Sequence, residues 1–138
     1  MTPYAKPLPK PDPVTAPFWN SLRDRRIAVQ RCDDCARYVF YPRALCPHCG
    51  SRRLSWTPVS GRGAIHTLTI VEKGPGAFRA DGRYVVALVD LDEGCRMMTN
   101  IVGVEPHPDH VRIGMPVEIV YDEVTDAVTL PKFRPASR

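Results

Sequence analysis

The sequence predicts a mainly β protein, in which a short N-terminal helix leads into a cysteine-rich segment and then into a small five-stranded barrel. Two C-x₂-C pairs between residues 32 and 49, and five strand-like segments after residue 62, are the observations behind this prediction. With 138 residues, the chain has the length of one domain or of two very small ones.

Residues 1–13 are expected to form an extended arm because they are rich in proline. The first 17 residues contain six of the fifteen prolines, and proline disrupts helix interiors and lacks the donor that a sheet ladder needs. The composition leaves two alternatives open for this arm. It wraps around the protein or a partner, or it forms a disordered tail.

Residues 14–28 are predicted to form a helix. Thr15 is a suitable N-cap, and Pro17 falls in the first turn, where its missing N–H costs nothing. Phe18 and Trp19 follow, and they have two interpretations: they dock the helix on its own domain, or they anchor a partner interface. Because adjacent helical positions point about 100° apart, we expect one ring to face inward and the other to remain available.

Four cysteines form two knuckles, Cys32 with Cys35 and Cys46 with Cys49, which are separated by ten residues. Two facing knuckles make the tetrahedral four-sulfur cage that suits zinc. Four sulfurs leave no open coordination position, so the sequence predicts one structural Zn²⁺ within a ribbon over residues 29–60. Iron in the same cage is an alternative, as is a redox-active C-x₂-C pair, although the chain lacks the βαβ context of the latter.

The residue after each knuckle must let the backbone turn, so that its N–H groups can point at sulfur. Gly50 fills this position after the second knuckle and Ala36 after the first. A left-handed backbone at Ala36 would cost about 1 kcal/mol. His48 lies inside the second knuckle, where the two cysteines already supply the ligands, so we expect its side chain to be exposed.

Residues 61–138 are predicted to form the barrel. A glycine-rich loop over 74–82 and a longer connector over 104–114 interrupt the strand-like segments. Five strands with a long connector between the third and the fourth favour a barrel of the OB type, because a β-sandwich usually needs about seven strands. The predicted strands are 63–73, 83–92, 95–104, 115–122 and 126–133.

The chain contains no recognisable catalytic motif. It has no G-x-S-x-G, Walker loop, H-E-x-x-H or dinucleotide fingerprint. Cys95 stands alone at the start of a predicted strand, and we expect it to be a buried, inert thiol. His66 lies within a predicted strand and is expected to have a structural role. The sequence therefore offers no candidate catalytic residue.

Composition and charge indicate the cellular compartment and the part of the chain that a charged partner would contact. No apolar run approaches the ~18–20 residues that span a bilayer, the N-terminal segment lacks the apolar core of a signal peptide, and five cysteines fit poorly with a disulfide framework. We therefore expect a cytoplasmic protein. Residues 1–62 contain 11 Lys and Arg against 4 Asp and Glu, whereas residues 63–138 contain 8 against 11. A polyanionic partner should contact the first, basic part.

Together, these motifs resemble a family of acyl-CoA-associated proteins that join an N-terminal helix, a rubredoxin-like zinc ribbon and an OB fold, and that was long known only as a domain of unknown function. The resemblance covers about residues 12–135. Many zinc ribbons share the knuckles, but their combination with the barrel segments is more specific. The matching segments are Phe18-Trp19, CDDC, CPHCG, SGRGAIHTLTIV, VALVDLDEG, IGMPVEIVYDEV and LPKFRP.

This resemblance implies a non-catalytic accessory subunit of an acyl-CoA enzyme. Members of the family bind thiolase-like enzymes, and some are paired or fused with MaoC-type hydratases. The implied role is to hold or channel the CoA thioester, here in lipid or sterol breakdown. Phe18 and Trp19 would then lie at the partner interface. Arginines of the basic part would contact the CoA phosphates; the candidates are Arg23, Arg25, Arg26, Arg31 and Arg43.

Two other functions are possible for such a chain. OB folds also bind single-stranded nucleic acid through a positive groove and stacking aromatic rings, but here the barrel half carries a net negative charge and few aromatic residues. An enzyme in its own right would need a nucleophile with a nearby base, and no such pair is visible. The accessory subunit is therefore the preferred hypothesis.

Overall fold

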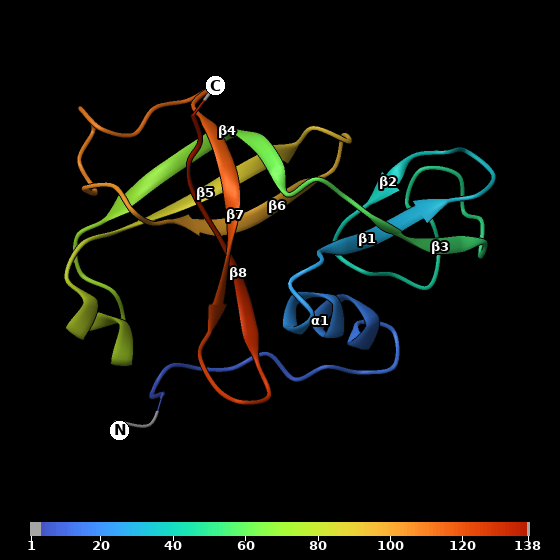
Figure 1. The fold of residues 1–138 in the computed structure, drawn as a ribbon, viewed down its shortest axis with the longest axis horizontal. Coiled ribbons are helices and arrows are strands. Elements are labelled where there is room, and N and C mark those ends of the chain that lie inside the picture. Colours follow the sequence, from blue (N-terminus) through green and yellow to red (C-terminus); the bar gives the residue numbers. More distant parts are fainter. Residues whose placement is uncertain (1–3, 138) are drawn as a thin grey trace.

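The computed structural model describes residues 4–137 and shows a three-stranded ribbon sheet beside a closed five-stranded barrel (Figure 1). The strand order is β2-β1-β3 in the ribbon and β4-β5-β6-β8-β7 in the barrel. The predicted mainly β architecture is thereby confirmed. In chain order the elements are α1 (Ala16–Arg23), β1 (Ala28–Cys32), β2 (Tyr38–Val39), β3 (Leu54–Pro58), β4 (Arg62–Val71), η1 (Gly76–Asp81), β5 (Tyr84–Leu91), β6 (Arg96–Ile101), β7 (Pro116–Glu123) and β8 (Thr129–Pro135).

The helix α1 is shorter than the predicted helix over residues 14–28. Arg25 has a φ of 55°, and its N–H donates to the carbonyl of Leu22 at 3.0 Å. This left-handed residue reverses the chain, so that β1 can begin at Ala28. The periodicity that suggested a longer helix arose because Ile27 packs in the core from outside it.

Asp12, rather than Thr15, caps the start of α1 with its side chain. Thr15 occupies the N-cap position, but its hydroxyl makes no capping bond to the helix. Instead, the Asp12 carboxylate accepts the N–H groups of Val14 and Thr15, both at 2.9 Å, while the Thr15 hydroxyl accepts the N–H of Asp12. This reciprocal pair turns the arm into the helix.

Each of the five predicted strand segments overlaps one barrel strand, with ends displaced by one to three residues. Alternation along β5 places Val85, Ala87, Val89 and Leu91 in the core. β4 pairs with β5 through a bulge at His66. The loop expected over 74–82 contains a short 3₁₀ helix, η1, which the glycine-rich composition did not predict.

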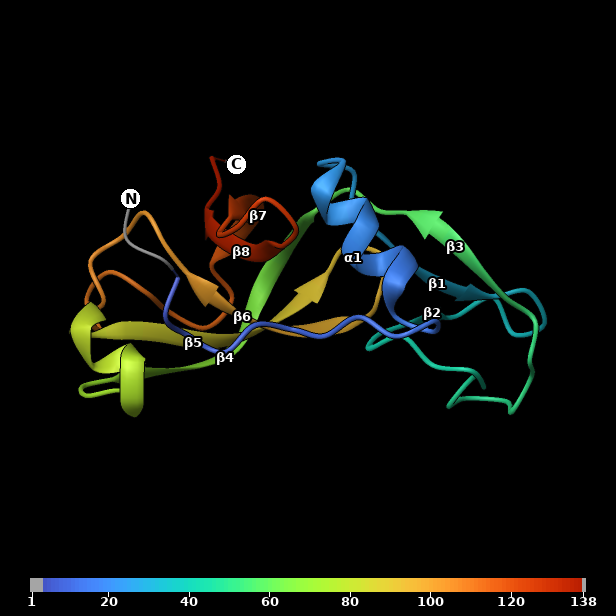
Figure 2. The same ribbon diagram turned by 90° about the horizontal axis from the view of Figure 1, so that it is seen from below.

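One continuous core joins the ribbon to the barrel through α1. Phe18 and Leu22 of the helix lie in the same buried cluster as Val89 and Phe133 of the barrel. Figure 2 shows α1 between the ribbon strands and the strands β7 and β8. Gly61, in the linker, has a φ of 75°, and a Cβ atom there would lie 2.5 Å from the side chain of Ile119. Only glycine therefore fits this close approach without a shift.

The described part of the arm, residues 4–13, lies extended against the barrel. The ammonium of Lys6 is 2.5 Å from the Asp81 carboxylate of η1 and lies 5.4 Å from the ring centroid of Phe78. These contacts fix the arm near Lys6. Within the described chain, no helix has both the length and the apolar character needed to cross a membrane.

Candidate functional site

The four predicted ligands converge in the ribbon. The Sγ atoms of Cys32, Cys35, Cys46 and Cys49 all lie within 4.8 Å of one another. The Sγ atoms of Cys32 and Cys49 are 3.6 Å apart, and those of Cys35 and Cys46 are 3.7 Å apart. A tetrahedron with Zn–S bonds of about 2.3 Å has edges of about 3.8 Å. The separations therefore fit a four-sulfur zinc site.

The backbone around each knuckle supports thiolate ligands. The N–H of Cys35 points at the Sγ of Cys32 at 3.5 Å, and the N–H of His48 points at the Sγ of Cys46 at 3.4 Å. Both turns end in the left-handed region, with a φ of 64° at Ala36 and 79° at Gly50. Ala36 thus carries the backbone strain that the sequence indicated.

The ionisation of the thiols also fits a bound cation. The backbone N–H of Cys35 lowers the pKa of the Cys32 thiol to about 7. At Cys49, the backbone N–H of Ser51 favours the thiolate, but the adjacent Cys32 thiol and burial outweigh it and raise the pKa to about 12. Neighbouring sulfurs oppose a second negative charge, and a central dication would remove this opposition.

Side chains around the knuckles hold the ribbon tip together. Asp34 accepts hydrogen bonds from Ser51 and from Arg53, the latter at 2.9 Å. The hydroxyl of Ser55 donates to the Asp33 carboxylate. These contacts connect the first knuckle to the segment after the second. The His48 ring is exposed and faces Arg37 at 3.3 Å, so it lies outside the sulfur cluster, as expected.

The two aromatic residues of α1 have different environments. Phe18 is 1% exposed, and its ring packs edge-on against Phe40 with centroids 5.2 Å apart. Trp19 is half-buried at the surface, and its Nε1 donates to the Tyr41 hydroxyl at 3.2 Å. Phe18 therefore packs within this chain, and Trp19 is the more exposed of the two rings.

An apolar groove beside Trp19 was not predicted from the sequence. Its volume is about 510 Å³, and its walls come from α1, the segment after β2, β6 and β8. Tyr41 and Met98 line it, and Met98 is 69% exposed. In a strand, one of two adjacent residues points inward and the other outward. Because Met97 and Met98 are equally apolar, their hydropathy did not show which of the two faces outward.

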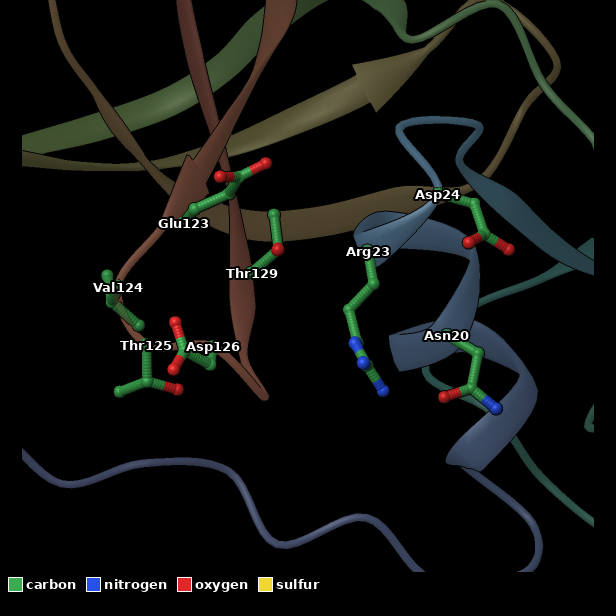
Figure 3. Close-up of a pocket in the computed structure, with 8 residues that line it drawn as sticks. All are labelled: Asn20, Arg23, Asp24, Glu123, Val124, Thr125, Asp126 and Thr129. Carbon is green, nitrogen blue, oxygen red and sulfur yellow. The ribbon is translucent and has the colours of Figure 1, made fainter.

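Two of the arginine candidates lie among carboxylates. Arg23 lines a polar hollow of about 740 Å³ between the end of α1 and the β7–β8 turn, together with Glu123 and Asp126. Figure 3 shows its side chain extending alongside α1, with both carboxylates across the hollow. Arg25 is 2.9 Å from the Glu123 carboxylate. A phosphate would be repelled by these acidic groups. Arg23 and Arg25 are thus poorly placed for the phosphates of CoA.

The other three arginines lie exposed on and beside the ribbon. Arg31 extends along the Tyr38 ring, 5.6 Å from its centroid, and its Nε donates to the Ala36 carbonyl. The backbone of Arg43 is fixed by two hydrogen bonds of 2.8 Å with the buried Gln30 side chain. Arg26 and Arg43 are likewise exposed.

The barrel residues considered from the sequence have no catalytic arrangement. Cys95 is 6% exposed, and burial raises the pKa of its thiol to about 11, as expected for an inert cysteine. His66 is exposed rather than buried. Its Nδ1 lies 3.3 Å from the Asp90 carboxylate and 3.2 Å from the Arg96 guanidinium. Arg96 also holds the pKa of Asp90 below its usual range.

Comparison with known proteins identifies both parts of the chain. The family model described as "ChsH2, rubredoxin-like zinc ribbon domain" matches residues 19–55, and "ChsH2, C-terminal OB-fold domain" matches residues 56–122. A solved structure described as "Ltp2-ChsH2(DUF35) aldolase" superposes with a TM-score of 0.82 at 36% identity, covering 94% of this chain and 100% of that one. A DUF35 protein from Sulfolobus solfataricus, at 16% identity and a TM-score of 0.64, shares the fold over 90% of this chain and 86% of its own.

Curated relatives agree with this assignment. A probable enoyl-CoA hydratase alpha subunit from Thermomonospora curvata is 40% identical over 121 residues, which are 86% of this chain but only 37% of that protein. A DUF35 domain-containing scaffold protein from Pyrococcus furiosus is 34% identical over 110 residues, 79% of either chain. A second scaffold protein, from Methanothermobacter thermautotrophicus, is 32% identical over 81% of this chain and 84% of its own. The chain therefore belongs to the DUF35 family.

Proposed function

We propose that this protein is a non-catalytic accessory subunit that binds a thiolase-like enzyme, or a MaoC-type hydratase, and helps hold the CoA thioester in lipid or sterol breakdown. One observation carries the proposal: the chain matches the whole of a chain described as part of an Ltp2-ChsH2(DUF35) aldolase, at 36% identity and a TM-score of 0.82. The match includes the helix, the ribbon and the barrel.

The descriptions of the relatives support an acyl-CoA enzyme as the partner. Two are named hydratase alpha subunits: the Thermomonospora curvata protein and a 3-oxo-4,17-pregnadiene-20-carboxyl-CoA hydratase subunit from Mycobacterium tuberculosis. This chain spans only 37% and 39% of them. It spans about four fifths of the archaeal proteins that are described as scaffolds.

The chemistry of the ribbon supports a structural role for its metal. We infer that Cys32, Cys35, Cys46 and Cys49 hold one Zn²⁺. A saturated four-thiolate site has no position for a substrate or an activated water molecule. The ion would instead fix the ribbon, which packs against α1 and thereby sets the position of Trp19.

The exposed arginines of the basic half are the candidates for CoA contact. Arg26, Arg31 and Arg43 are exposed and away from the acidic hollow that holds Arg23. A guanidinium can bind a phosphate through two parallel hydrogen bonds. We therefore assign the CoA phosphates to these three residues in the assembled complex.

Copurification from native cells tests the proposal. The tagged chain, expressed at its normal level, should retain an acyl-CoA enzyme identified by mass spectrometry, and the complex should carry an activity on acyl-CoA that the isolated chain lacks. Turnover of an acyl-CoA by the isolated chain and by its Cys95→Ser variant would contradict a non-catalytic role. Binding of single-stranded DNA at low salt, with no enzyme retained, would favour a nucleic-acid function instead.

Substitution at the α1 surface tests the partner interface. Trp19→Ala should weaken the complex by about 2 kcal/mol or more, because aromatic anchors carry much of the binding energy in interfaces. Val14→Ala, at an exposed apolar residue beside the helix, is the control and should leave the affinity unchanged. An unaltered affinity for Trp19→Ala would exclude α1 from the interface.

A further inference from the structure

The barrel is closed by a weak seam between β6 and β8. The two strands share one parallel pair, Ile101 with Phe133, and the N–H of Val102 donates to the Phe133 carbonyl at 2.7 Å. In Figure 1, β6 runs across the view whereas β8 runs along its height, so the strands separate away from this pair. The rest of the β6 edge faces the opening.

Two prolines explain why the seam does not close further. Backbone groups of alternate residues in a strand point to the same edge. Phe133 points its carbonyl at β6, so Pro131 and Pro135 face the same edge. Neither has an N–H group. Along this edge of β8, only Phe133 among these three residues can donate to β6.

The opposite edge of the seam has backbone groups that lie outside this pair. The N–H of Leu91 donates to the Cys95 carbonyl at 2.8 Å, which fixes the alternation between β5 and β6. In that register, Met97 and Thr99 bond to β5, while the N–H and C=O of Met98 point toward the seam. The pair of Ile101 with Phe133 lies three residues beyond Met98, and between them the Thr99 hydroxyl donates to the Pro131 carbonyl at 3.0 Å across the seam.

The apolar groove beside Trp19 runs along this edge. Five consecutive β6 residues, 96–100, and three consecutive β8 residues, 130–132, line it. Consecutive residues line a groove when it follows the edge of a strand, because residues on one face alternate. Trp19 and Tyr41 form the facing wall. An exposed strand edge beside an apolar surface is a site at which another strand can pair.

An extended segment already occupies the other end of the same seam. A second hollow, of about 260 Å³, shares Asn100, Leu130 and Lys132 with the groove. Tyr4, Lys6 and Pro7 of the N-terminal arm line that hollow. The seam thus accommodates extended polypeptide at one end and leaves the Met98 end open.

We propose that the partner enzyme contributes an extended segment that pairs with β6 at Met98 and places an apolar side chain against Trp19 and Tyr41. The charged residues among those lining the groove are Arg96 and Lys132, both cationic. Their carboxylate partners, Asp90 and Asp122, are not among the lining residues. A segment with acidic residues on both sides of its apolar anchor complements this pattern. The inference rests on the proposed function, because it specifies how that partner is bound.

Hydrogen exchange of the copurified complex tests this pairing. The free chain should exchange the Met98 amide rapidly, because Met98 lies outside the β6–β8 pair of Ile101 with Phe133, and the complex should slow this exchange roughly tenfold or more. The amides of Met97 and Thr99 should be protected in both states, since they bond to β5. Exchange at Ile113, which is 68% exposed on another part of the barrel, should not change.

Two variants separate the backbone contact from the side-chain contact. Met98→Pro removes the N–H that points away from β5 and toward the seam, and it should weaken the complex about tenfold or more. Met98→Asp places a charge in the groove and should have a similar effect, whereas Ile113→Asp is the matched control and should bind normally. Metal content and melting temperature establish that each variant is folded; if Met98→Pro unfolds, Met98→Asp and the exchange measurement decide.

The outcomes are distinguishable from failure of the proposed function. If an acyl-CoA enzyme copurifies but the Met98 amide stays unprotected and both Met98 variants bind normally, strand pairing at β6 is wrong and the accessory role stands. If light scattering shows that the chain alone forms a dimer, and the Met98 amide is already protected in that dimer, the occupant is a second copy and the proposal is overturned. If no enzyme partner is retained, both proposals fall.

Discussion

The ribbon and the barrel achieve order by different means. Among the described residues, the ribbon has its own buried cluster of only Cys32, Val39 and Cys46. The main cluster has fifteen buried residues from α1, β1 and the barrel. Two of the three ribbon residues are predicted metal ligands. The ribbon therefore depends on its sulfur cluster, whereas the barrel depends on apolar burial.

Loss of the sulfur cluster should have the largest effect, because it should unfold the ribbon and leave the barrel folded. Cys46→Ser should abolish metal binding, which in small ribbons contributes on the order of 10 kcal/mol to folding. Hydrogen exchange should then show loss of protection in β1 and β3, while β5 stays protected. Cys95→Ser, which removes a buried thiol outside the cluster, should keep one metal per chain. If the ribbon amides stay fully protected from exchange in metal-free protein, the ribbon does not depend on its sulfur cluster.

Removing the ring that joins the two parts should reduce the stability of both. Phe18→Ala deletes a fully buried side chain between ribbon and barrel and should lower the free energy of unfolding by about 3–5 kcal/mol. Denaturant titration followed by Trp fluorescence and by amide exchange in β5 should show both parts shifting together. If the unfolding transition of the ribbon alone shifts, Phe18 does not couple the stability of the ribbon to that of the barrel.

Alkaline pH should weaken the barrel through Cys95. Burial raises the pKa of this thiol to about 11, from an ordinary value of about 9. Below pH 9 the thiol is neutral in both states and has no effect. Between pH 9 and pH 11 the unfolded state loses its proton first, so the free energy of unfolding should fall, by about 3 kcal/mol at most.

The variant Cys95→Ala isolates this contribution. Stability of the wild type should fall relative to the variant as the pH rises from 9 to 11, as measured by urea titration. Parallel pH curves for the two proteins would show that the thiol ionises equally in the folded and unfolded states.

The smallest expected effect lies in the first knuckle. Ala36 has a φ of 64°, where an alanine costs about 1 kcal/mol relative to glycine, although glycine also gains entropy in the unfolded chain. Ala36→Gly should therefore stabilise the ribbon by about 0.5 kcal/mol. Competition with a chelator should show slightly tighter metal retention, whereas Gly50→Ala should show the reverse.

Local patterns were sufficient for much of the fold. Metal ligation requires two closely spaced pairs of sulfur donors, so the positions of Cys32, Cys35, Cys46 and Cys49 indicated the ribbon directly. Alternation and turn residues located the barrel strands to within three residues, because each strand must bury one face. The helix end was misplaced because Ile27 continues the apolar pattern after the backbone has already turned at Arg25.

The sequence by itself determined the cysteine cluster, the five strands and the basic character of the first half, since each depends on residues close together in the chain. Only the tertiary structure decided which aromatic ring faces outward, which arginines lie among carboxylates, and where the barrel remains open. Trp19 and Met98 are 79 positions apart, and they line one groove because the packing of the elements brings both α1 and β6 to its walls. Contacts of that kind depend on how the elements pack, which local residue patterns do not encode.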